Sequence, residues 1–177
     1  MYFAALLART EDGWEASDTE LDDVETLADL AELAREAAAD DGETVIVFIE
    51  QEDAWFGVVR VDGEDDPRVF VSNGAAAARS SYGEILTSEI LGDEPDDALD
   101  DLTDLDGTED GEPEAADEDD EAADGAAAVA PPGPLGETLI LADLGMDERA
   151  LLGLETGDAL GEIADAIGAA DILEAVR

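Results

Sequence analysis

The side chains that could do chemistry in this sequence are almost all carboxylates. The 177 residues include 51 Asp and Glu, seven Arg and no Lys, His or Cys. Most nucleophiles, proton shuttles and soft metal ligands at neutral pH are drawn from Lys, His and Cys. Zinc hydrolysis, thiol catalysis, Schiff-base chemistry and Ser-His dyads are therefore excluded. Carboxylate sites for Mg²⁺ or Ca²⁺ and a carboxylate-pair hydrolase survive.

Two acidic clusters have the residue types of a cation site. Asp62, Glu64, Asp65 and Asp66 crowd one turn, but the segment lacks the full ligand pattern and the closing Glu of a calcium loop. The acidic run at 117–121 attracts divalent ions only weakly. We therefore expect a solvated turn, and predict neither a metal site nor a cofactor.

A third segment has the form of a loop that enters a helix. Ser72-Asn73-Gly74 is followed by Arg79-Ser80-Ser81-Tyr82, and backbone amides at such a place can cradle an anion. The segment has no phosphate-loop pattern, and the surrounding charge repels phosphate. A nucleotide site is therefore not favoured.

Aromatic residues and Arg suggest a binding surface instead. Trp55 lies on one face of a predicted strand, while Phe56 and Arg60 lie on the other. Aromatic residues and Arg concentrate binding energy in protein interfaces. Trp55, Phe56 and Arg60, together with Arg79 and Tyr82, are therefore the candidate interface residues. The alternative is that helices cover both faces of the sheet.

The formal net charge of -44 limits the choice of partner. Every phosphate contact needs a basic side chain, so direct nucleic-acid binding is not expected. A basic protein surface would be attracted, faster at low salt than at high salt. The alternative is that the charge serves only solubility or salt tolerance.

The chemistry-bearing residues are positioned by three predicted regions. Residues 1–92 form an α+β domain, in which a small antiparallel sheet of order β-α-β-β-β-α is covered by helices. Its strands are the apolar runs at 2–9, 45–49, 54–61 and 68–72, with a possible return strand at Gly13-Trp14. Residues 75–91 have the pattern of a broken helix.

The first helix of this domain has predicted ends and a predicted buried face. Asp22 and Glu25 have the spacing of a capping box, and Gly42 lies just past the predicted end. An apolar stripe at helical spacing predicts that the helix covers the sheet; it comprises Val24, Leu27, Leu30, Ala31, Leu33, Ala34 and Ala38.

The rest of the chain divides by composition. Residues 93–134 form an acidic, Ala- and Pro-rich stretch that cannot bury enough apolar surface to offset its ordering entropy, which predicts a disordered linker. Residues 135–177 predict a small module of three short helices, with Asp147, Asp158 and Asp171 as N-caps. About 40 residues make a marginal core alone, so the module should dock on the first domain or on a partner.

The location expected from the sequence is the cytoplasm. The absence of Cys fits a reducing compartment. The apolar N-terminal stretch has no basic region before it and is too short for a signal peptide or a membrane span. We therefore expect no membrane association.

Five segments together resemble the tRNA adenosine deaminase-associated proteins. They are Tyr2 to Leu6, Val45 to Ile49, Trp55 to Val58, Phe70 to Ser72 with Tyr82, and Ile140 to Met146. The resemblance covers the two folded regions and not the acidic stretch. That family is named for lying beside the gene of a zinc-dependent tRNA adenosine deaminase, and it brings no established catalytic residues. The chain cannot itself be the deaminase, whose zinc site needs His and Cys.

These observations favour a non-enzymatic accessory protein that binds a basic protein partner, with a tRNA adenosine deaminase as the partner that the resemblance implies. It could inhibit the enzyme as a polyanion decoy or dock elsewhere and stabilise it. Two alternatives remain open: a carboxylate-based, Mg²⁺-dependent enzyme, and a salt-adapted structural protein without a specific partner. The sequence does not predict the oligomeric state.

Overall fold

The computed structural model describes residues 2–17, 21, 23–38, 43–92 and 130–176. Asp22, Gly42, the acidic run at 117–121 and most of the predicted linker lie outside these residues. No helix in the described ranges is long and apolar enough to cross a membrane.

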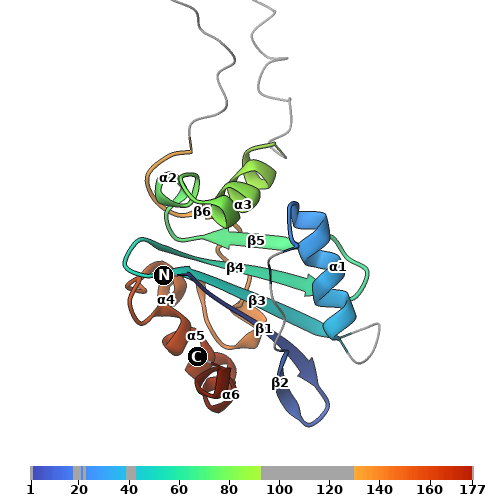
Figure 1. Ribbon diagram of the computed structural model, residues 1–177. Coiled ribbons are helices and arrows are strands. Elements are labelled where there is room, and N and C mark those ends of the chain that lie inside the picture. The colour runs from blue at the N-terminus through green and yellow to red at the C-terminus, as the bar shows by residue number, and fades with distance from the viewer. Residues whose placement is uncertain (1, 18–20, 22, 39–42, 93–129, 177) are drawn as a thin grey trace, which may run out of the picture.

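The centre of the structure is a six-stranded antiparallel sheet with the order β2-β1-β3-β4-β5-β6 (Figure 1). The strands are β1 (Tyr2–Thr10), β2 (Gly13–Ser17), β3 (Thr44–Gln51), β4 (Trp55–Asp62), β5 (Arg68–Val71) and β6 (Leu135–Gly136). The predicted α+β class and antiparallel sheet are confirmed, including the return strand at Gly13. The two-residue strand β6 was not predicted.

Helices from the first half of the chain cover one face of this sheet. They are α1 (Leu27–Ala37), α2 (Gly74–Ala77) and α3 (Ser81–Gly92), so the predicted broken helix is confirmed as two helices. Leu27, Leu30, Ala31 and Ala34 are the buried residues of α1. They pack in one apolar cluster with Val47 and Val59 of the central strands. The predicted stripe therefore does face the sheet.

The start of α1 differs from the predicted one. Thr26 is the N-cap, and its side chain forms a reciprocal capping box with Asp29. Glu25 therefore precedes the helix, and its backbone N–H donates a longer bond to Asp29, at 3.3 Å. Thr26-x-x-Asp29 has the same spacing as the predicted pair, and it begins the helix just before its first buried residue.

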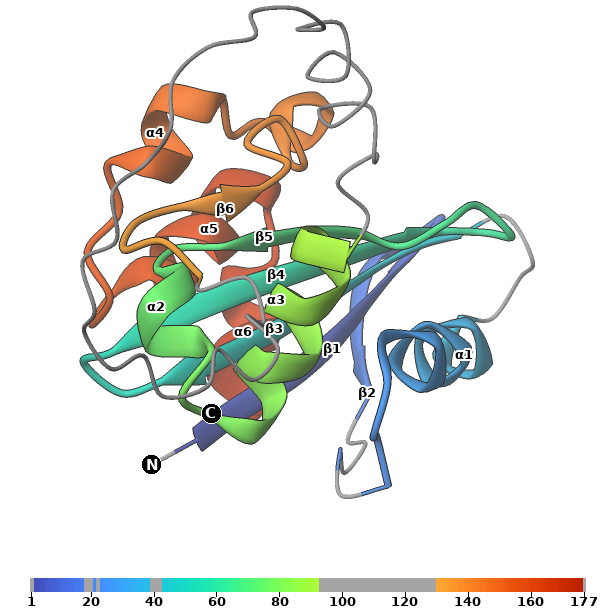
Figure 2. The ribbon, with the colours of Figure 1, turned by 90° about the horizontal axis from the view of Figure 1, so that it is seen from above.

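The C-terminal residues cover the opposite face (Figure 2). After β6 they form a 3-10 helix, η3 (Ala142–Leu144), followed by α4 (Glu148–Leu152), α5 (Ala159–Ile167) and α6 (Ala170–Val176). Asp147 caps α4 through a bond from Ala150 N at 2.9 Å, as predicted. Asp158 stands at the N-cap of α5 but makes no side-chain bond there.

A second apolar cluster, on the face covered by the C-terminal helices, contains residues from both the N-terminal strands and the C-terminal helices. Leu160, Ile163 and other buried residues of the C-terminal helices pack against Phe48 and Phe56 of the sheet. The Trp14 side chain of β2 donates a hydrogen bond to the carbonyl of Ile167 at 2.9 Å. The C-terminal helices therefore dock on the sheet of the same chain.

The end of the predicted linker is tied to α2. Gly74 N donates to the carbonyl of Gly133 at 2.8 Å, and Ala75 N donates to that of Pro131 at 3.0 Å. Ala130 is buried. Residues 130–134 therefore guide the chain into β6 rather than standing apart from the fold.

Candidate functional site

Trp55 and Phe56 lie inside the two layers of the core. Each is at most 1% exposed: Trp55 belongs to the apolar cluster that includes residues of α1 and α3, and Phe56 to the one that includes the C-terminal helices. The indole N–H of Trp55 donates to Gln51 Oε1 at 2.9 Å. Helices cover both faces of β4, which is the alternative that the sequence left open. Neither aromatic ring is therefore on the surface of this fold.

Arg60 is buried where the C-terminal segment crosses the sheet. Its side chain shares a face of β4 with Phe56, and it is 6% exposed. A buried guanidinium must be paired and hydrogen-bonded to offset its lost hydration. The C-terminal segment supplies the Ile140 carbonyl, at 2.9 Å from Nη1, and both carboxylate oxygens of Asp143, with Nη2 to Oδ2 at 2.8 Å.

This fork-to-fork pair sets the protonation of both partners. The hydrogen bond with Asp143 raises the pKa of Arg60, against the opposing effect of burial, and Asp62 raises it further. The hydrogen bond from Arg60 lowers the pKa of Asp143 below its ordinary value. Both groups are therefore charged at neutral pH and fasten the C-terminal segment to β4.

Asp62 extends the cluster to the neighbouring strand. Arg60 and Arg68 are directly opposite in β4 and β5, and Asp62 accepts from both, at 3.0 Å and 2.6 Å. Burial raises the pKa of Asp62, but hydrogen bonds from Thr44, Arg68 and Arg60 outweigh it and lower the pKa overall. One carboxylate thus relieves the repulsion between two facing guanidinium groups.

The two segments that were weighed as cation and anion sites, and not favoured, bond to other parts of the chain. Asp62 is engaged by arginines, and Arg35 donates to the carbonyls of Gly63 and Asp65, each at 3.0 Å. Among the described residues no three carboxylates converge on a possible metal ion.

At the loop entering α2, the amide of Ala76 donates to the side chain of Asn73 at 3.1 Å. The amides of the two residues before Ala76 bond the 131–133 segment, so this loop offers no anion cradle.

Arg79 and Tyr82 are the two predicted interface residues that reach the surface. Tyr82 is half-buried, and its ring meets that of the exposed Tyr2 edge to face, with centroids 5.6 Å apart. Arg79 is exposed, three residues before Tyr82, and its side chain has no ion pair with any residue in the described ranges. We call Tyr2, Arg79 and Tyr82 the tyrosine surface.

The comparison with known families decides where this fold belongs. The model of the Rv3753c-like tRNA adenosine deaminase-associated protein family matches residues 2–170. The chain belongs to this family. The match spans the sheet and the C-terminal helices α4 and α5, so the resemblance predicted from five segments is confirmed. Neither curated proteins nor solved structures give a match.

Sequence reasoning about this deaminase-associated protein missed three residues of the site. Asp143 was noted only within the segment Ile140 to Met146, and Asp62 only as part of an acidic turn. Tyr2 was noted only as the start of a strand and of the segment Tyr2 to Leu6. One available signal was the single Arg in an otherwise apolar strand, Arg60, which needs a carboxylate from elsewhere in the chain.

Proposed function

We propose that this deaminase-associated protein is an accessory protein without catalytic activity of its own, and that it binds a basic protein partner. The tRNA adenosine deaminase that gives the family its name is the candidate partner. We also propose a cytoplasmic location, because the family is associated with tRNA modification and the chain lacks cysteine. The observation that carries the proposal is how the fold uses its few arginines.

Several arginine side chains are bonded to other groups within the fold. Arg60 and Arg68 are held by carboxylates, and Arg35 is bound to backbone carbonyls. Three of the seven arginines are thus committed within the fold, whereas most of the described carboxylates are exposed. The surface that a partner meets is therefore dominated by negative charge, which attracts a basic protein and repels nucleic acid.

Specific contact needs more than charge, and the tyrosine surface supplies suitable residues. Tyr and Arg are enriched among the residues that dominate binding energy, because they combine apolar area with hydrogen bonding. Tyr2 is 45% exposed, and Arg79 is available for a carboxylate of the partner. In this proposal the acidic surface accelerates encounter, and the tyrosine surface makes the specific contact. Trp55, Phe56 and Arg60 support the fold beneath it.

Calorimetric titration of the deaminase from the same genome with the full chain tests this proposal. We expect saturable binding at 0.15 M salt that weakens at 0.5 M salt. Arg79→Ala with Tyr82→Ala should weaken binding about tenfold or more, whereas the exposed Arg149→Ala should leave it unchanged. Binding that vanishes at 0.15 M salt, or that falls equally in both variants, would contradict a specific interface.

A further inference from the structure

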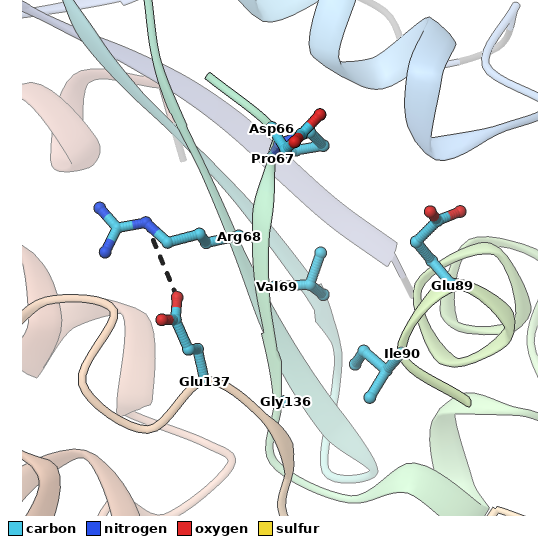
Figure 3. A pocket seen from close by; sticks show the side chains of 8 residues that line it. All are labelled: Asp66, Pro67, Arg68, Val69, Glu89, Ile90, Gly136 and Glu137. Carbon is cyan, nitrogen blue, oxygen red and sulfur yellow. Dashed lines mark ion pairs between the residues drawn. The ribbon is translucent and has the colours of Figure 1, made fainter. Parts of the chain in front are cut away.

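A groove of about 440 Å³ runs along the outer edge of β5 (Figure 3). It begins where β6 stops, because β6 pairs only with the last two residues of β5. Figure 3 shows α3 on one side of the groove and the Arg68–Glu137 pair on the other. This volume lies within the range of small-ligand pockets, so a long side chain fits with part of its backbone.

The floor of the groove is apolar. Pro67 and Val69 come from the edge strand and its preceding turn, and Ile90 comes from α3. Val69 belongs to the buried apolar cluster beneath α3, and the partly buried Ile90 packs against that cluster. An aliphatic stem laid across this floor would therefore be removed from water on one side.

Carboxylates stand around this floor. Asp66 and Glu89 are exposed, and within the described ranges neither side chain has a hydrogen bond or an ion pair. Among the described residues, the Glu137 side chain has only a loose pair with Arg68, at 3.7 Å, while Arg68 is held more tightly by Asp62, at 2.6 Å. The groove therefore presents three carboxylates against one cation that is already satisfied.

We propose that this groove receives a lysine or arginine side chain of the basic partner. The stem lies on Val69 and Ile90, and the charged end meets Asp66 and Glu89. Long cationic side chains bind in this way because they bury their methylene stems while the head stays with charge or water. The inference rests on the proposed function and names where the partner's charge is recognised.

A second acidic hollow, along α1, differs from the groove and provides a control. Asp29, Glu32 and Glu36 line a hollow along α1. There the carboxylate of Asp29 is already used by the helix cap, and the hollow lies on the outer side of a helix rather than at a sheet edge. The exposed pair Glu32 and Glu36 is therefore a control of equal charge.

The experiment compares the wild-type chain, Asp66→Asn with Glu89→Gln, and the control Glu32→Gln with Glu36→Gln. Each is titrated against the deaminase at 0.15 M salt. The first variant should raise Kd about tenfold, since two charge pairs are lost, and the control by less than about twofold. An equal change in both variants would show that only total charge matters, and would overturn the groove.

A second probe separates the groove from the identity of the partner. N-acetyl-arginine methylamide is titrated into the full chain while methyl NMR signals are followed. The Val69 and Ile90 signals should shift in the wild type and in the control, and not in Asp66→Asn with Glu89→Gln. If the deaminase binds and the Val69 and Ile90 signals do not shift, the groove proposal is wrong while the proposed function stands. If they shift and the deaminase does not bind, the proposed function fails alone.

Discussion

Replacing Asp143 by Asn should loosen the C-terminal segment from the sheet. The substitution preserves the shape of the side chain and one acceptor, but it removes the charge that pairs with Arg60. Arg60 keeps Asp62 and the Ile140 carbonyl. The perturbation therefore isolates the ion pair between β4 and the C-terminal segment.

The expected cost lies between those of buried and surface pairs. Breaking a buried pair costs about 3–5 kcal/mol, and an exposed pair is worth about 0–1 kcal/mol. The side chain of Arg60 is 7% exposed and that of Asp143 is 57% exposed, so solvent screens one partner. Together with the acceptor that Asn retains, this gives a loss of about 1–2 kcal/mol in the free energy of unfolding. The melting temperature should fall by roughly 4 °C.

Urea unfolding followed by circular dichroism measures this loss, with Asp165→Asn as the control. Asp165 is an exposed carboxylate on α5 whose side chain has no bond within the described ranges. Both variants remove one negative charge from a chain of net charge -44, so both gain the same relief of general repulsion. Their difference reports the pairing. Equal unfolding free energies for the two variants would refute the role given to Asp143.

The other predictions concern the packing of the C-terminal segment against the sheet. The stability difference between wild type and Asp143→Asn should be full above the ordinary pKa of 3.8 and should disappear as the pH falls through the lowered folded pKa of Asp143; a difference that persists in strong acid would contradict this. Trp14→Phe should cost about 1–2 kcal/mol by urea unfolding, since the Ile167 carbonyl loses its donor. Gly136→Ala should cost about 2 kcal/mol or more, because the residue has φ +88 and a Cβ would meet Val69 O at 2.1 Å. Gly157→Ala, in open space, should change stability by less than about 0.5 kcal/mol.

Local patterns in the sequence predict much of the fold. The run Val45 to Ile49 is apolar on both faces, as a central strand must be, and it is β3 with both faces covered. The stripe of α1 likewise predicts which residues face the sheet. The start of α1 was predicted one turn early, because Asp22–Glu25 and Thr26–Asp29 have the same spacing. Thr26 is the actual N-cap, and the next residue, Leu27, is the first buried residue of the helix.

Long-range features of the candidate site were beyond such patterns. Arg60 and Asp143 are 83 residues apart, and nothing in the spacing of either residue selects the other. Strand β6 has only two residues, so no alternation marks it. The burial of Phe56 depends on C-terminal helices whose docking face is set by the whole core. By contrast, Arg79 is exposed and Tyr82 is half-buried, so both reach the surface, and their role in binding stays a prediction.

The measurement that tests the accessory role most directly is the rate of adenosine deamination in tRNA by the deaminase, at physiological salt, with increasing amounts of this protein. We predict a rate that changes to a plateau as the protein saturates the enzyme, in either direction, with the plateau reached at higher protein concentration for Arg79→Ala with Tyr82→Ala. A rate that is unchanged at large excess of the wild-type chain would contradict the account.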